Sequence, residues 1–245
     1  MNRFTTDIKN NTNKNKQKKD IDIAIAVLSA GVGQRIKSYE PRSMIKINDK
    51  SLIDIQISVF KECFLSPEII GVFGYDFQKI CKKLSNKIRM VENQIYETTN
   101  TAESMRLAFN STLKPSFMFL HGDLIFNNET LLDLDYSKSF VITDTKGRLE
   151  DKEAGLTIVN NKATIFSYGL KSKWCQIAHF TGKELKIARQ IFNKFELADK
   201  KMLSFEVLNR MISMGASFNC YEPKKMKIIE IDKIGNYVNE NINLQ

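Results

Sequence analysis

The chain has 245 residues, of which 42% are hydrophobic, so it is long enough to form one large α/β domain around its own core. It has no apolar run long enough to cross a bilayer and no signal peptide, which predicts a soluble cytoplasmic protein with no membrane partner. The four cysteines are scattered without a C-x-x-C pair. This argues against a zinc site or a disulfide framework, and we expect buried, reduced thiols.

The net charge of +9 is partly concentrated near the N-terminus. Residues 1–20 are polar, rich in Asn and Lys, and have little to bury. We therefore predict a disordered basic tail over 1–20 and a folded domain over 21–245. The sequence has no interleaved aromatic and basic pattern and no nucleic-acid reader motif, which argues against a nucleic-acid partner. The remaining positive charge is compatible with small phosphorylated ligands.

Strands and helices alternate in the first half of the chain, where four apolar runs predict strands and two amphipathic segments predict helices. The strands are expected at Ile21–Leu28, Glu68–Phe73, Ile88–Glu92 and Ser116–Leu120, and the helices at about Leu52–Leu65, capped by Ser51, and at Asp76–Leu84. This alternation predicts an α/β fold with a mostly parallel central sheet and flanking helices.

From Phe140 onwards the pattern favours antiparallel strands, with a two-residue turn signal at Asn160-Asn161. The expected strands are Phe140–Thr143, Ala154–Asn160, Lys162–Phe166, Trp174–Phe180, Ser217–Tyr221 and Lys227–Ile231, and the expected helices are Gly182–Phe195, Leu203–Met214 and a short Ile234–Asn239. Antiparallel additions of this kind often close over a second ligand. Lys171, Lys173 and Trp174 are candidates for that contact, although a solvated edge strand explains the lysines equally well.

The stretch after the first strand combines glycines and cations. Gly31 and Gly33 leave backbone N–H groups accessible, and Arg35, Arg42 and Lys46 add positive charge, a combination that suits a polyphosphate. Its spacing excludes a Walker A loop, which needs Lys-Ser/Thr after the second glycine. It also excludes the dinucleotide fingerprint, which needs a third glycine.

Two further polar groups follow predicted strands. Thr98, Thr99, Asn100 and Ser104 carry hydrogen-bonding side chains that can read a base edge or a ribose hydroxyl, although Thr101 could simply cap a helix there. Gly122-Asp123 ends the strand that begins at Ser116, and a carboxylate at this position can hold Mg²⁺ or cap the next turn.

Ala30-Gly31-Val32-Gly33-Gln34-Arg35, together with Pro41–Ile47, resembles the signature of nucleotidyltransferases of the sugar-phosphate and phosphocholine cytidylyltransferase type. The resemblance implies a GT-A-like, Rossmann-like fold with a small antiparallel addition. In that family the loop backbone and its arginine hold the NTP phosphates, and a lysine after the proline assists the attack. Arg42 stands at that lysine position, and Lys46 stands where many relatives have proline.

The resemblance also extends to the polar segments. Thr99-Asn100 and Ser104 look like the cytidylyltransferase segment that favours CTP, while Gly122-Asp123 and Glu230-Ile231-Asp232 look like the segments that hold Mg²⁺. The residues expected to act are Arg35, Arg42 and Lys46 in catalysis, Leu28, Ala30, Gly31, Gly33, Asn100, Ser104 and Gly122 on the nucleotide, Asp123 and Asp232 on the metal, and Tyr96, Lys171 and Trp174 on the acceptor.

The expected activity is magnesium-dependent transfer of NMP, with CMP favoured, from an NTP to phosphocholine, a phosphonate or a sugar phosphate, with release of pyrophosphate. A homodimer is compatible with this reading. One alternative is a GT-A glycosyltransferase that uses a nucleotide sugar, although the D-x-D motif usual in such enzymes is missing around Asp123. The other alternative is a non-catalytic nucleotide-binding domain, supported only by Arg42 in place of lysine.

Overall fold

A nine-stranded mixed sheet forms the centre of the computed structural model, which describes residues 17–32, 41–84, 86–147 and 149–231. In their order across the sheet, the strands are β5 (Arg89–Glu92), β4 (Glu68–Phe73), β1 (Ile23–Ser29), β6 (Ser116–His121), β11 (Ser172–Thr181), β8 (Phe140–Asp144), β12 (Asn219–Tyr221), β10 (Lys162–Tyr168) and β9 (Ala154–Val159). No helix in these described ranges has the length and hydropathy needed to cross a bilayer.

The sheet is parallel at one end and mainly antiparallel at the other. Strand β1 pairs in parallel with β4 and β6, and β4 does so with β5, as the strand–helix alternation predicts. Strand β11 then runs antiparallel to both β6 and β8. At the far edge, β9 and β10 form a hairpin whose turn residues Asn160 and Asn161 have φ of 49° and 60°, which confirms the predicted two-residue turn.

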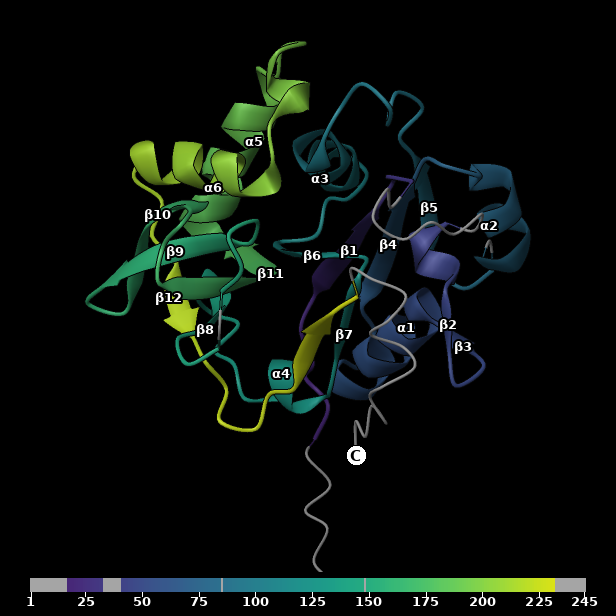
Figure 1. Cartoon of the computed structure of the whole chain (residues 1–245), viewed down its shortest axis with the longest axis horizontal. Helices are drawn as coiled ribbons and strands as arrows, with labels where there is room; N and C mark the ends of the chain where they lie inside the picture. The colour runs from purple at the N-terminus through teal and green to yellow at the C-terminus, as the bar shows by residue number, and fades with distance from the viewer. Residues whose placement is uncertain (1–16, 33–40, 85, 148, 232–245) are drawn as a thin grey trace, which may run out of the picture.

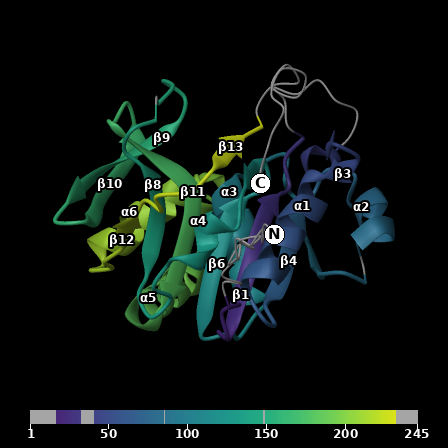
Figure 2. The ribbon, with the colours of Figure 1, turned by 90° about the horizontal axis from the view of Figure 1, so that it is seen from below.

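Helices cover both faces of this sheet (Figures 1 and 2). The helices are α1 (Leu52–Cys63), α2 (Phe77–Leu84), α3 (Thr101–Asn110), α4 (Glu129–Leu132), α5 (Gly182–Asn193) and α6 (Ser204–Ser213), with short 3₁₀ turns η1 (Arg42–Met44) and η2 (Asp199–Lys201). The alternation of side chains along β1 separates two cores. Ala24 and Ala26 pack in one cluster with residues of α3, α5 and α6, and Ile23 and Ile25 pack in the other with residues of α1 and α4.

Two small strand pairs complete the fold. Strands β2 (Lys46–Ile47) and β3 (Lys50–Ser51) form a short hairpin before α1, and β13 (Ile228–Glu230) pairs antiparallel with β7 (Leu124–Phe126). In Figure 1, β13 is the yellow strand that returns beside β7. The backbone N–H of Ile231 donates to the carbonyl of Asp123 over 2.8 Å. The end of the described chain therefore lies next to the residues that follow β6.

Local details differ from expectation at three places. Asn100, not Thr101, is the N-cap of α3, and its side chain accepts from the N–H of Thr101. All four cysteines are free, but Cys81 is only partly buried. Lys19 pairs with Phe64, so ordered contacts begin before residue 21. The predicted helix at residues 234–239 lies outside the described residues.

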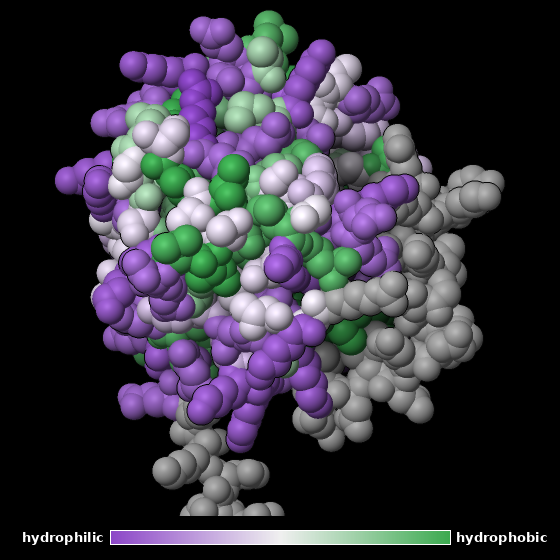
Figure 3. Space-filling model, turned by 60° about the vertical axis from the view of Figure 1, so that its left-hand side comes forward, coloured by the Kyte–Doolittle hydropathy of each residue, from purple (hydrophilic) through white to green (hydrophobic). Residues whose placement is uncertain are grey.

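The edge hairpin exposes several apolar side chains. Val159 on β9 and Ile165 and Tyr168 on β10 are each about half exposed, and Figure 3 shows hydrophobic residues reaching the surface on this side of the molecule. These positions lie at the far end of the sheet from β1. They therefore belong to the sheet's edge and not to the loops around the glycine stretch.

Stability should depend on pH through His179, which is fully buried and stacked on Phe140 with ring centroids 4.7 Å apart. Its Nδ1–H donates to the Lys138 carbonyl, and burial lowers the pKa of His179 from 6.5 to about 4. Between about pH 6.5 and 4, His179 binds a proton in the unfolded chain but not in the folded chain. The free energy of unfolding should therefore fall as the pH drops through this range. Urea unfolding at several pH values measures this free energy. If it depends on pH in a His179→Phe variant as strongly as in the parent protein, the prediction is wrong.

Candidate functional site

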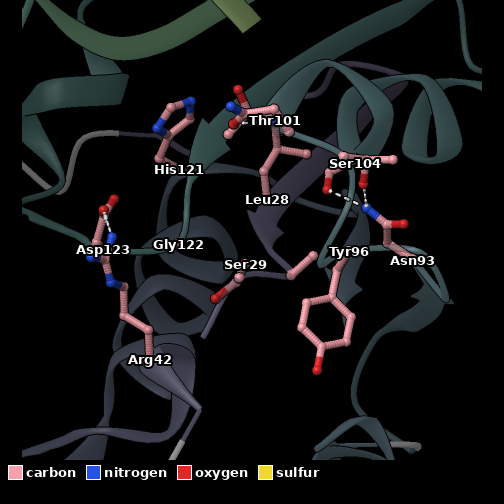
Figure 4. Close-up of a pocket in the computed structure, with 14 residues that line it drawn as sticks. Leu28, Ser29, Arg42, Asn93, Tyr96, Thr101, Ser104, His121, Gly122 and Asp123 are labelled. Atoms are coloured by element: carbon pink, nitrogen blue, oxygen red, sulfur yellow. Dashed lines mark hydrogen bonds and ion pairs between the residues drawn. The ribbon is translucent and has the colours of Figure 1, made fainter. Parts of the chain in front are cut away.

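A pocket of about 670 Å³, its open mouth included, lies at the carboxyl ends of β1 and β6. Ligands of parallel α/β sheets bind at such ends, beside the turns that follow the strands. The pocket is lined by ten residues that the sequence predicted, namely Leu28, Ala30, Gly31, Arg42, Tyr96, Thr99, Asn100, Ser104, Gly122 and Asp123. It is also lined by four that were not predicted, namely Ser29, Asn93, Thr101 and His121. Segments far apart in the sequence thus form one site (Figure 4).

One end of the pocket is built around an ion pair. Arg42, on η1, donates from Nη1 to Oδ2 of Asp123, which is only 5% exposed. The other carboxylate oxygen of Asp123 is buried and has no hydrogen-bond partner among the described residues, and the same holds for Nε of Arg42. Figure 4 shows the two side chains facing each other at this end. A buried carboxylate and a guanidinium therefore each keep an unused polar atom at the pocket.

Unsatisfied polar atoms are concentrated here. Within the described ranges, five residues have a buried side-chain polar atom without a partner, and three of them, Ser29, Arg42 and Asp123, line the pocket. Folded proteins pair nearly all such atoms, because burying a polar group without a partner costs about 1–3 kcal/mol. The concentration indicates that a polar ligand completes the site.

The donor set fits magnesium. The free oxygen of Asp123 is a hard ligand, and Mg²⁺ commonly takes one or two carboxylates together with substrate phosphates. Asp232, the second expected ligand, lies outside the described residues, but it directly follows Ile231, whose N–H binds the Asp123 carbonyl. Within the described ranges no three His, Cys, Asp or Glu side chains gather in a way that could hold a metal. A cation here would therefore rely on ligand oxygens as well as protein carboxylates.

Glu230 adds to the negative charge at this end. Its burial and then its proximity to Asp123 raise the pKa of Glu230 to about 7. Strand β13 brings it there, because Glu230 pairs with Leu124, the residue after Asp123. Two acidic side chains thus lie close together near the pocket, and a bound cation would relieve their repulsion.

The other end of the pocket is a hydrogen-bonded loop held by Asn93. The Asn93 side chain is 1% exposed, donates to Thr99 Oγ1 and Ser104 Oγ over 3.1 and 3.4 Å, and accepts from the N–H of Ile95. Figure 4 shows Asn93 and Ser104 pointing toward each other beside Tyr96. Asn93 therefore ties the loop before α3 to Ser104 on that helix, and this arrangement presents Asn100 and Ser104 to the pocket.

His121 connects the pocket to the second half of the chain. Its Nε2 lies 2.9 Å from the Ser204 hydroxyl, at the start of α6, and the backbone N–H of Ser204 donates to Thr101 Oγ1. Desolvation lowers the pKa of His121, so the ring is neutral at pH 7. His121 therefore contributes packing and hydrogen bonding at the edge of the pocket.

Gly122 should not tolerate a side chain. A Cβ added there would lie 2.5 Å from the Ser29 Cβ, whereas one added at Gly31 would meet nothing within 4 Å. We expect Gly122→Ala to lower stability by about 1–3 kcal/mol, since overpacking forces the neighbouring strand ends apart. Thermal unfolding measures this loss. The control is Gly31→Ala, whose unfolding temperature should stay near that of the parent protein. Equal unfolding temperatures for both variants would contradict the close packing of β1 and β6 at this point.

The other candidates named from the sequence either lie away from the pocket or fall outside the described residues. Lys46 is exposed on β2, and Lys171 is exposed in the turn before β11. Trp174 is 2% exposed and belongs to the core, where its Nε1 donates to the Ile177 carbonyl and its ring packs edge-on against His121. Trp174 can therefore act on a ligand only through His121. The residues outside the described ranges are Gly33, Arg35 and Asp232.

Of the four pocket residues that sequence reasoning missed, two had a readable signal. Ser29 is the last residue of β1, and Asn93 directly follows β5, so both stand at carboxyl ends of parallel strands. The rule that selected Asp123 would have selected them as well. Thr101 and His121 gave no such signal, because their places depend on long-range contacts with Ser204.

The fold is that of the nucleotidyltransferases. No protein-family model matches the sequence, and no curated protein sequence matches it either. Among solved structures, the inositol-1-phosphate CTP transferase from T. maritima aligns with a TM-score of 0.72 at 16% identity, over 90% of this chain and 93% of that one.

Two further solved structures have the same fold. The CTP:phosphocholine cytidylyltransferase LicC from Streptococcus pneumoniae aligns with a TM-score of 0.69 at 20% identity, over 89% of this chain and 96% of that one. A UDP-glucose pyrophosphorylase in complex with UDP-glucose aligns with a TM-score of 0.68 at 13% identity, over 89% and 96% of the two chains. The predicted GT-A-like nucleotidyltransferase fold is therefore confirmed.

Proposed function

We propose that the chain is a magnesium-dependent nucleotidyltransferase that transfers the NMP part of an NTP, preferably CTP, to a phosphorylated small molecule and releases pyrophosphate. The observation that carries the proposal is the set of unpartnered polar atoms of Ser29, Arg42 and Asp123 in one pocket. The names of the similar structures, which mention CTP, phosphocholine, inositol 1-phosphate and UDP-glucose, support the reaction class.

The two ends of the pocket would bind different parts of the nucleotide. The backbone N–H groups of the Gly31 turn and the guanidinium of Arg42 would hold the triphosphate, completed by Gly33 and Arg35 as in the family that the loop resembles. The loop that Asn93 fixes would hold the nucleoside through Asn100 and Ser104. Asp123 and Asp232 would hold Mg²⁺, which neutralises the phosphates and fixes their orientation when bound.

In the transfer step an acceptor phosphate oxygen forms a bond to the α-phosphorus. The bond from the α-phosphorus to the oxygen that bridges to the β-phosphate breaks, and pyrophosphate leaves with that electron pair. The attacking oxygen is already an anion, so no protein group has to remove a proton. The protein acts by positioning the reactants and stabilising charge, which suits a pocket whose charged side chains among the described residues are Arg42 and Asp123.

Pyrophosphate release tests the proposal. The purified chain with Mg²⁺ would be given ATP, CTP, GTP or UTP together with choline phosphate, 2-aminoethyl phosphate, inositol 1-phosphate or glucose 1-phosphate. We expect acceptor-dependent release that is highest with CTP and is abolished by EDTA. Nucleotide-sugar hydrolysis or transfer without pyrophosphate release would instead support a glycosyltransferase. We also propose a homodimer, which light scattering after size-exclusion chromatography tests.

A further inference from the structure

A second cavity, of about 390 Å³ with its open mouth included, lies between the β7–β13 pair and the neighbouring ends of β8 and β11. Its polar lining consists of Asp144, Lys173, Cys175, Gln176 and Glu230. Cys175 is buried, and burial raises the pKa of its thiol to about 12, so it stays protonated. None of these side chains lines the nucleotide pocket, so the cavity is a distinct space.

The cavity adjoins the end of the nucleotide pocket where Asp123 lies. Glu230 in the cavity pairs with Leu124, the residue after Asp123. Gln176 donates from Nε2 to Glu230 Oε2 over 2.5 Å. Its side chain also acts on His121, which lines the nucleotide pocket, because it partly offsets the lowering of the His121 pKa by desolvation. A molecule whose phosphate reaches the Asp123 end can therefore extend its remaining part into this cavity.

The side chain of Gln176 is directed there by an irregularity in β11. The pairing of β11 with β8 shifts register between Trp174 and Ala178, and Gln176 has φ of 58°. A bulge of this kind redirects a side chain out of the regular alternation and is over-represented next to active sites. Here the bulge allows Trp174 to pack in the core while Gln176, two residues later, lines the second cavity.

The lining has an excess of negative charge. The ammonium of Lys173 is paired with Glu153, so it is already neutralised. Asp144 uses Oδ1 to accept from the backbone N–H groups of Lys146 and Gly147, and neither Asp144 nor Glu230 forms an ion pair within the described residues. A ligand that brings positive charge and hydrogen-bond donors would satisfy both carboxylates.

The type of cation follows from what lines the cavity. Quaternary ammonium groups cannot donate hydrogen bonds and are usually recognised by aromatic faces, and no aromatic side chain among the described residues lines this space. A primary ammonium has three N–H donors, and carboxylate oxygens are the acceptors it pairs with most strongly. The lining therefore suits a primary amine better than a trimethylammonium group.

We propose that this cavity binds the end of the acceptor remote from its phosphate, and that this end carries a primary ammonium held by Asp144 and Glu230. The acceptor is then an aminoalkyl phosphate or phosphonate. This inference rests on the proposed nucleotidyltransferase function and specifies its second substrate. It also gives a role to the bulge at Gln176 and to the Asp144 carboxylate, which nucleotide binding leaves unused.

The test compares kcat/KM for acceptors matched in size, with CTP and Mg²⁺ held constant. The probes are 2-aminoethyl phosphate, choline phosphate and glycerol 3-phosphate. We expect 2-aminoethyl phosphate to be used at least about tenfold better than the other two, which is the size expected for a charge-assisted hydrogen bond. A preference for choline phosphate or for glycerol 3-phosphate would overturn the inference.

Two variants locate the selectivity. Asp144→Asn keeps the oxygen that accepts from Lys146 and Gly147, so the loop should fold normally. We expect it to lower kcat/KM for 2-aminoethyl phosphate by on the order of tenfold, with little change for glycerol 3-phosphate. The matched control is Glu222→Gln, whose carboxylate accepts from Thr145 outside the cavity and should leave both values unchanged.

The outcomes separate the two proposals. Pyrophosphate release with glycerol 3-phosphate but not with the amine overturns the inference while leaving the nucleotidyltransferase function in place. Equal losses for all acceptors in Asp144→Asn also overturn it, because the carboxylate would then act on structure or on turnover and not on the ammonium. Absence of pyrophosphate release with every NTP and every acceptor contradicts the proposed function itself.

Discussion

Asp123→Asn should abolish most turnover while leaving the fold intact. Asparagine keeps the shape of the side chain but removes the charge that would hold Mg²⁺ and that now pairs with Arg42. Loss of one such charged contact is expected to lower kcat by on the order of 10²–10³. Pyrophosphate release at saturating Mg²⁺ measures the effect.

The control for Asp123→Asn is Asp135→Asn, which removes an exposed carboxylate paired with Lys138 away from the pocket. Thermal unfolding checks that both variants are folded. If Asp123→Asn turns over at close to the parental rate when Mg²⁺ is saturating, the metal assignment is wrong. A variant that fails to fold can be replaced by Asp123→Ser in the same assay, since serine leaves room for water at the site.

Arg42→Ala should raise the KM for the NTP and lower kcat, because the guanidinium supplies both charge and paired donors to the phosphates. The expected loss in kcat/KM is on the order of 10²–10³. Arg42→Lys restores the charge without the planar pair of donors, so it should recover part of the loss. Steady-state kinetics with varied CTP measures both variants. Parental kinetics for Arg42→Ala would exclude it from the triphosphate site.

The same Arg42→Ala variant should also show metal-dependent stability. Removing the guanidinium leaves the carboxylate of Asp123 buried without a partner, which is destabilising. Added Mg²⁺ should then raise the unfolding temperature of Arg42→Ala more than that of the parent protein. An equal shift in the two proteins would show that Asp123 is not the residue that binds the cation.

Local sequence patterns predicted the parallel end of the sheet well, because each of its strands is followed by a helix or a turn with its own signal. Asp123 could be predicted for the same reason: it follows a glycine at the end of the apolar strand β6. The place of β11, between β6 and β8, could not be read in this way. Its pairing depends on contacts between segments that are distant in the sequence. The alternation of strands and helices along the chain does not show that an antiparallel strand is inserted between β6 and β8.

Trp174 shows where residue type misleads. A tryptophan after two lysines resembles a ligand platform, yet its ring packs in the core against Phe119 and Phe166. The bulge after Trp174 changes the alternation of β11, so periodicity alone cannot say which side chains face the cavity. Asn93 was missed for a related reason, because its value to the site lies in its bonds to Thr99 and Ser104 after the loop has folded.

Binding of a non-reacting nucleotide tests the central claim most directly. The α,β-methylene analogue of CTP cannot release pyrophosphate, so calorimetric titration with Mg²⁺ isolates the pocket from turnover. We predict one nucleotide bound per chain, binding that weakens strongly without Mg²⁺, and loss of that Mg²⁺ effect in Asp123→Asn. No binding of the α,β-methylene analogues of ATP, CTP, GTP or UTP, or binding that is unchanged by Mg²⁺ and by Asp123→Asn, would contradict the account.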